Sequence, residues 1–149
     1  MDEGEVAPEM NQIELHPYLQ QPELLTFAEE QSIPLTAYSP LGSYDRPDEM
    51  KADDEPVLLE DSTIAEIADR HDASPAQVLI SWAVHRGTAV IPKSTTPAHI
   101  RENLAAAGLD LTEDDMDAIA SLNKSRRYLQ GGLWTMEGSP YTQSGLWEE

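Results

Sequence analysis

Strand-length apolar segments alternate with helix-length segments along this chain, and that alternation constrains its fold most strongly. Residues 11–15 alternate polar and apolar side chains as a short strand does, and residues 33–38 and 88–91 are two further apolar segments of strand length. Helical periodicity separates these segments and continues after the last one. The order predicts an α/β fold in which parallel strands are connected by covering helices.

Capping residues indicate where the expected helices begin. Each expected start has a proline suited to the first helical turn or a hydroxyl side chain suited to an N-cap: Pro22, Thr63, Ser74, Thr96 and Thr112. Ser74 is followed by Pro75 and Gln77, and Thr63 by Glu66 at capping-box spacing. Gly87 suits the C′ position of a helix. In the last helix Met116, Ile119 and Ala120 are expected to face inward, and residues 45–61 are expected to form a surface loop.

Three parallel strands cannot form a closed barrel, and both outer strands would expose unpaired backbone groups. We therefore expect residues 1–149 to form one partial domain that something else completes, with residues 1–9 disordered. An open sheet of this kind also predicts an unstable isolated chain, because little burial offsets the conformational entropy of folding.

The charge balance and composition exclude several classes of function. Nine Lys and Arg residues face 28 Asp and Glu residues, for a net charge of −19, so nucleic acid would be repelled. The absence of cysteine excludes disulfides and Cys-based zinc sites. The sequence has neither a membrane-spanning apolar run nor a signal peptide, which predicts a cytoplasmic protein. An acidic surface poor in lysine is typical of halophiles, and an acidic mesophile protein is the alternative.

Four segments in register carry a family resemblance: residues 11–18 (NQIELHPY), 36–42 (TAYSPLG), 90–94 (VIPKS) and 101–103 (REN). Their order and spacing resemble strands six, seven and eight of the aldo-keto reductases, and residues 134–141 resemble the C-terminal segment of some members. The resemblance covers residues 8–149. It implies the C-terminal half of a (β/α)8 TIM barrel, incomplete as an isolated chain because such a barrel typically needs about 250 residues.

The resemblance implies a nicotinamide cofactor at the C-terminal ends of the strands, where ligands of such barrels bind. It places Asn11 and Gln12 in the cofactor site, with the Gln12 amide on the nicotinamide carboxamide. Tyr38 would stack on the nicotinamide ring. The pyrophosphate would lie under a loop that includes Ser39, Leu41 and Ser43. Without the resemblance, a buried amide, a core tyrosine and an ordinary turn are the alternatives for these residues.

A second cluster would hold the adenosine end of the cofactor. Lys93, Ser94 and Thr95 precede a helix N-terminus, which attracts anions. The family binds the adenosine 2′-phosphate here, which implies NADP(H). Glu102 and Asn103 resemble residues at the adenine edge. His99, however, stands where the family often has an arginine that stacks on adenine and pairs with the phosphate, so NAD(H) stays open.

The family's catalytic Asp, Tyr, Lys and His all precede the first strand of this chain, so no catalytic residue is predicted within it. Neither Tyr18 nor His16 replaces them, and the four histidines lack metal-ligand spacing. Trp134 and Tyr141 would line the substrate mouth or pack on the barrel. The resemblance implies NADP(H)-dependent reduction of aldehydes or ketones to alcohols, with an inactive isolated chain. The partners would be a small carbonyl or alcohol substrate and a separately encoded N-terminal half. The alternatives are a non-catalytic half barrel that binds NADP(H) or a partner, and an inactive gene remnant.

Overall fold

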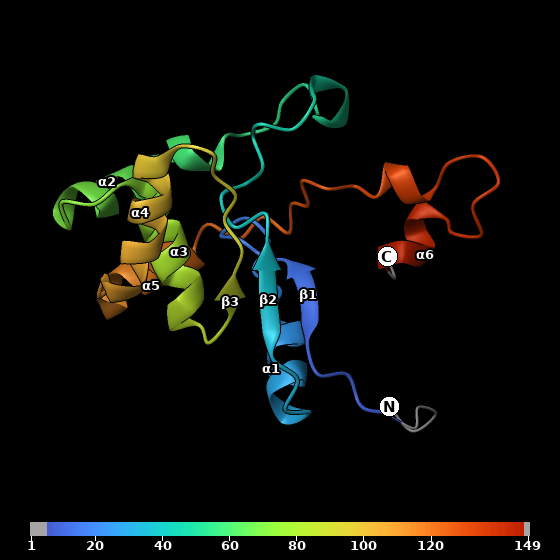
Figure 1. The fold of residues 1–149 in the computed structure, drawn as a ribbon, viewed down its shortest axis with the longest axis horizontal. Helices are drawn as coiled ribbons and strands as arrows, with labels where there is room; N and C mark the ends of the chain where they lie inside the picture. Colours follow the sequence, from blue (N-terminus) through green and yellow to red (C-terminus); the bar gives the residue numbers. More distant parts are fainter. Residues whose placement is uncertain (1–5, 148–149) are drawn as a thin grey trace.

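A computed structural model describes residues 6–147 of the chain. Figure 1 shows its elements, and their order confirms the predicted alternation of strands and helices. In chain order, with η for 3-10 turns, they are β1 (Asn11–Glu14), α1 (Pro22–Glu30), β2 (Leu35–Tyr38), η1 (Asp48–Met50), η2 (Leu58–Glu60), α2 (Ser62–Arg70), α3 (Pro75–His85), β3 (Ala89–Val90), α4 (Pro97–Ala105), η3 (Ala106–Gly108), α5 (Glu113–Ala120), η4 (Gly132–Trp134) and α6 (Gln143–Trp147).

The three strands form one parallel sheet in the order β1-β2-β3, as predicted. Gln12 lies opposite Thr36, and Thr36 opposite Ala89. The crossover from β1 to β2 contains α1, and the crossover from β2 to β3 contains α2 and α3. All three strands therefore end at the same edge of the sheet, where a ligand site is expected in open α/β folds.

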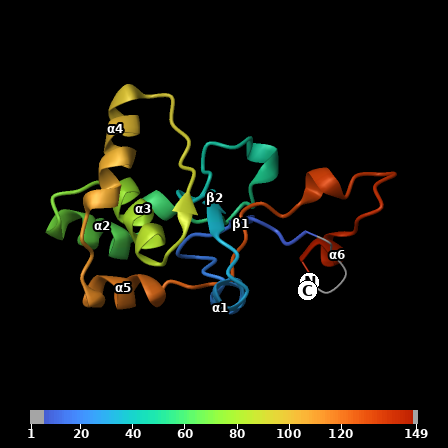
Figure 2. The same ribbon diagram turned by 60° about the horizontal axis from the view of Figure 1, so that its bottom comes forward.

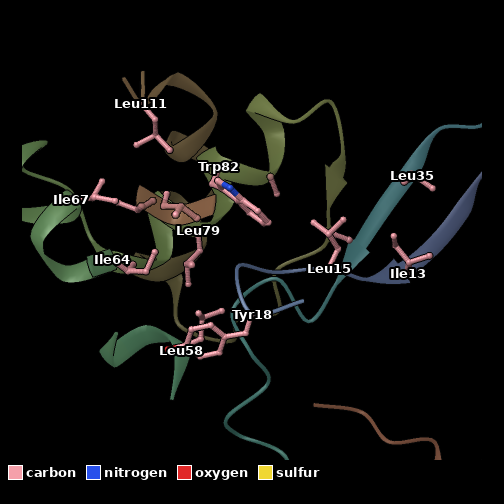
Figure 3. Packing of buried hydrophobic residues seen from close by; sticks show 14 of the residues in the cluster. Ile13, Leu15, Tyr18, Leu35, Leu58, Ile64, Ile67, Leu79, Trp82 and Leu111 are labelled. Atoms are coloured by element: carbon pink, nitrogen blue, oxygen red, sulfur yellow. The ribbon is translucent and has the colours of Figure 1, made fainter. Parts of the chain in front are cut away.

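The hydrophobic core lies between one face of the sheet and the helices (Figure 3). Ile13, Leu35 and Ala37 contribute from the strands, and Trp82 of α3 is 1% exposed. The alternate strand residues belong to the opposite face. There Gln12 and Ala89 are exposed, whereas Glu14 and Thr36 are buried. Parallel sheets are normally covered on both faces, whereas this sheet leaves part of one face open at Gln12 and Ala89.

Local capping signals predicted most helix starts correctly. Ser74 with Gln77 and Thr112 with Asp115 both form capping boxes, and Gly87 follows α3 with a positive φ of 79°. The prediction for α2 was wrong, because Thr63 lies inside the first turn. Asp61 is the N-cap instead, and its carboxylate accepts from the backbone N–H groups of Thr63 (2.9 Å) and Ile64 (3.3 Å).

Residues 45–61 are more ordered than the predicted surface loop. They contain η1 and η2, and Leu58 is only 1% exposed. The guanidinium of Arg46 is buried against the Glu55 carboxylate and donates to the carbonyl oxygens of Ser43 (2.9 Å) and Met50 (3.2 Å). In α5 the predicted inward position of Ala120 was also wrong: Ile119 is buried, and Ala120 is exposed.

Residues 130–147, here called the C-terminal arm, extend away from the helices in both ribbon views (Figures 1 and 2). The arm folds back on itself, since the Trp147 indole donates to the Gln130 carbonyl at 3.1 Å. The Arg127 guanidinium lies 3.9 Å from the centroid of a Trp147 ring. None of the helices described within residues 6–147 has the length and apolar character that a membrane span needs.

Candidate functional site

A groove of about 490 Å³ lies beyond the C-terminal ends of β2 and β3. Its two walls are the loop that follows β2 and the segment that leads from β3 into α4. The start of α3 contributes a third side. The lining residues are Ser39, Pro40, Leu41, Ser43, Tyr44, Asp45, Leu59, Ser74, Pro75, Ala76, Ile91, Pro92, Lys93, Ser94, Thr95, Thr96, His99, Glu102 and Asn103.

The loop after β2 has an unusual backbone. Ser39, Gly42 and Ser43 all have positive φ, at 52°, 84° and 48°, and the Ser43 hydroxyl donates to the Ser39 hydroxyl at 2.7 Å. Gly42 is required by space as well as by φ, because a Cβ there would lie 3.0 Å from Leu58 Cβ. The turn thus brings two hydroxyl groups to one side of the groove.

An ion pair joins the two walls. Lys93 Nζ lies 2.5 Å from a carboxylate oxygen of Asp45, and both side chains are largely exposed. The hydrogen bond from Lys93 lowers the pKa of Asp45, and the same bond raises the pKa of Lys93. Both groups are therefore charged at neutral pH. Because exposed ion pairs stabilise weakly, this one can open to admit another anion.

The start of α4 offers backbone donors to the groove. Thr96 is its N-cap, but the Thr96 side chain makes no capping hydrogen bond, unlike the caps of α3 and α5. The Ser94 hydroxyl accepts from the Thr96 backbone N–H at 3.2 Å. Uncapped N–H groups and the helix dipole favour an anion at this point. His99, Glu102 and Asn103 follow on one face of α4, as their spacing requires.

The groove brings together nine of the residues predicted for a cofactor: Ser39, Leu41, Ser43, Lys93, Ser94, Thr95, His99, Glu102 and Asn103.

The other predicted residues do not line the groove. Asn11 and Gln12 lie on β1 and are exposed. Tyr38, at the end of β2, is half-buried; burial and the nearby Glu14 carboxylate raise its pKa, against the effect of the Arg127 guanidinium. Trp134 and Tyr141 lie on the C-terminal arm and are 51% and 59% exposed.

Several lining residues were missed from the sequence. Leu59, Pro75 and Ala76 give the groove an apolar side, and Asp45 supplies the partner of Lys93. A polar segment predicted as a surface loop gave no reason to single out Leu59 or Asp45. Pro75 and Ala76 were recognised as a helix start, but no local signal places that start beside α4.

Tyr18 and His16 have structural partners. The Tyr18 hydroxyl donates to the Asp61 carboxylate at 2.6 Å. Burial is the largest cause that raises the pKa of Tyr18 strongly, and the bond to the charged Asp61 raises it further. A phenol held in this way is a poor proton donor at neutral pH. His16 is fully buried against the Glu14 carboxylate at 2.9 Å. Among the described residues no three His, Asp or Glu side chains are grouped as a metal site needs.

Comparison with known proteins gives a consistent family match. The sequence profile of the "Aldo/keto reductase family" matches residues 1–124. An aldo/keto reductase of Synechocystis sp. is 54% identical over 97% of this chain, and aldo-keto reductase family 1 member A1 of Gallus gallus is 46% identical over 91%. An NAD(P)H-dependent D-xylose reductase of Candida tropicalis is 45% identical over 87%. The chain spans 44%, 40% and 40% of the lengths of these three relatives.

Proposed function

The chain belongs to the aldo/keto reductase family, and from that premise we propose that its groove binds a nicotinamide dinucleotide. The observation that carries the proposal is the meeting of Lys93, the uncapped start of α4 and the hydroxyl-bearing turn of Ser39 and Ser43 in one groove. Each of these features suits phosphate oxygens. The apolar side formed by Leu59 and Ala76 suits a planar base. A relative named as NAD(P)H-dependent supports the same cofactor class.

We further propose that the chain is the C-terminal half of a (β/α)8 barrel that reduces aldehydes or ketones to alcohols. A reduced nicotinamide supplies a hydride to the carbonyl carbon. The chain's own residues would bind and orient the dinucleotide: the groove residues at the phosphate and adenine end, and Tyr38 with Asn11 and Gln12 at the nicotinamide end. The carbonyl oxygen also needs a proton donor. Tyr18 is committed to Asp61, so we assign that donor to a part of the barrel outside this chain.

The charges of the groove bear on the choice between NADP(H) and NAD(H). Lys93 favours a 2′-phosphate, and we propose NADP(H) on that ground. Asp45 already pairs with Lys93, and the Glu102 carboxylate also lines the groove. Both carboxylates oppose an added phosphate, and His99 offers no full charge when neutral. The preference for NADP(H) is therefore expected to be weak, and NAD(H) is the alternative cofactor.

A substitution at His99 tests this selectivity. His99→Arg adds a full charge and a planar donor to the groove, so it should raise the ratio of NADPH affinity to NADH affinity about tenfold, as expected for one charge-assisted contact. His85→Arg is the matched control, because His85 is exposed at the end of α3 and does not line the groove. An unchanged ratio in His99→Arg would exclude a 2′-phosphate site beside α4.

The partly open face of the sheet favours a second candidate, a half barrel that binds a partner. Gln12 and Ala89 are exposed on that face, and Ile91 beyond β3 is 49% exposed. A separately encoded N-terminal half would cover such a face and complete the barrel. Co-expression of the two halves should then give a stable heterodimer with reductase activity. A heterodimer without activity would indicate a non-catalytic module, and a chain that neither folds nor pairs would indicate a gene remnant.

Titration of the purified chain with NADPH tests the binding proposal itself. Lys93→Ala should weaken binding, whereas Lys51→Ala should leave it unchanged, because Lys51 pairs with Asp48 outside the groove. Equal affinities for the two variants would remove Lys93 from the site. A cooperative thermal transition without any NADPH binding would contradict the proposed function.

A further inference from the structure

Tyr128 supports the loop that forms one wall of the groove, although it does not line the groove itself. Its hydroxyl donates to the Pro56 carbonyl at 2.8 Å. Its ring lies 5.3 Å from the Arg46 guanidinium, and a Cβ at Gly42 would come within 3.3 Å of it. Gly42 and Arg46 lie near the start of the loop between β2 and η2, and Pro56 lies near its end. Tyr128 therefore contacts this loop through its ring at one end and through its hydroxyl at the other.

The loop in turn positions the charged residue on its groove side. Arg46 is 9% exposed, and its guanidinium ties the Ser43 and Met50 carbonyls to the Glu55 carboxylate. Asp45, the neighbour of Arg46, pairs with Lys93 across the groove at 2.5 Å. The part of the loop that contacts Tyr128 through Arg46 thus lies one residue from the carboxylate of Asp45 on the groove wall.

Tyr128 also fixes the start of the C-terminal arm. The backbone N–H groups of Tyr128 and Leu129 donate to the Glu14 carboxylate at 2.6 and 3.1 Å. Glu14 is 1% exposed. Burial alone would raise its pKa, but the hydrogen bond and charge of His16 and the two N–H donors lower it. A charged carboxylate at the end of β1 thus holds the residues immediately before the arm.

We propose that Tyr128 is a positioning residue that couples occupation of the groove to the order of the C-terminal arm. A dinucleotide that fixes the loop also fixes Tyr128 through Pro56, and the backbone of Tyr128 leads directly into the arm. The coupling is reciprocal, because a fixed arm favours the loop conformation that binds the ligand. The identity of the ligand rests on the proposed function, whereas the coupling rests on the contacts of Tyr128.

Hydrogen–deuterium exchange of the purified chain, with and without saturating NADPH, tests this coupling. Tyr128→Phe keeps the ring but loses the bond to Pro56. Tyr141→Phe is the matched control, since Tyr141 lies on the arm and is 59% exposed. NADPH should slow exchange in residues 39–45 and 91–103 in all three proteins. It should slow exchange in residues 128–147 only in wild type and Tyr141→Phe. Loss of one hydrogen bond should also weaken NADPH binding about fivefold in Tyr128→Phe.

Other outcomes separate the coupling from the proposed function. Equal protection of residues 128–147 in Tyr128→Phe and wild type would overturn the coupling, as would groove protection without arm protection in wild type. Absence of groove protection in wild type would overturn the proposed function, and the coupling with it. Glu14→Gln provides a second test through the opposite contact, and it should likewise abolish arm protection while residues 78–83 of the core keep their slow exchange. Retained arm protection in a folded Glu14→Gln variant would overturn the coupling.

Discussion

Asp115 is a buried carboxylate that joins α5 to the end of α2, and replacing it should destabilise the chain. One of its oxygens accepts from Thr112 N (3.0 Å), Thr112 Oγ1 (2.7 Å) and His71 Nε2 (2.7 Å), and the other accepts from Arg70 Nη2 (2.5 Å). Hydrogen bonds to charged groups each contribute roughly 1.5–3 kcal/mol. An asparagine at this position keeps the capping hydrogen bonds but loses the negative charge. The half-exposed Arg70 guanidinium can then form hydrogen bonds with water instead. We therefore expect Asp115→Asn to cost about 2 kcal/mol and Asp115→Ala about 3 kcal/mol.

Urea unfolding at several pH values measures this cost. Burial opposes ionisation of Asp115, but Arg70, His71 and Thr112 outweigh it and bring its pKa well below the ordinary 3.8. A carboxyl group whose pKa is lower in the folded than in the unfolded state stabilises the fold at pH values above its unfolded-state pKa. This stabilisation is lost as the pH falls through the folded-state pKa. The difference in free energy of unfolding between wild type and Asp115→Asn should have its full size at pH 7 and decrease below about pH 4.

The control for this experiment is Asp117→Asn, an exposed position on the same helix, which should change stability by less than about 0.5 kcal/mol. The reasoning would be refuted if Asp115→Asn and Asp117→Asn changed the free energy of unfolding equally, or if the difference between wild type and Asp115→Asn grew as the pH fell.

Three further predictions follow from the loop, the core and the charge. Gly42→Ala places a side chain at a positive φ against Leu58, so it should lower the free energy of unfolding, measured by urea denaturation, by more than about 1 kcal/mol. The same variant should weaken NADPH binding, and an unchanged affinity would argue against the loop as a groove wall. Leu58→Ala leaves a cavity where the side chain is 1% exposed and should cost about 2–5 kcal/mol, against less than about 1 kcal/mol for exposed Leu104→Ala. A net charge of −19 should make the melting temperature rise with KCl, because about 1 M salt shortens the Debye length to about 3 Å; a fall in melting temperature would contradict a halophilic surface.

Sequence reasoning succeeded where the determining contacts are local. The capping box of Ser74 and Gln77 spans four consecutive positions, and its residues alone specify the start of α3. Parallel pairing of the strands follows equally from the helices between them. Nine of the twelve residues that the family motifs singled out for a cofactor line one groove, and their role in binding a cofactor stays a prediction.

The missed features depend on contacts between distant segments. Asp61 caps α2, and it is also hydrogen-bonded to Tyr18, 43 positions earlier. Glu14 accepts from Tyr128, 114 positions later. Thr63 has a locally plausible capping-box pattern, but Asp61 is an equally good N-cap residue type two positions earlier, and its carboxylate makes the capping bonds. Spacing along the chain carries no signal for such pairs.

Chemical-shift mapping of the ¹⁵N-labelled chain with NADPH tests the central claim, that the groove between the loop after β2 and the start of α4 is a dinucleotide site. Saturable shifts should appear at the amides of residues 39–45 and 93–103, including Lys93 and His99. They should be absent from residues 25–35 at the opposite end of the strands. Shifts confined to residues outside the groove, or none at millimolar NADPH in a folded sample, would contradict the claim.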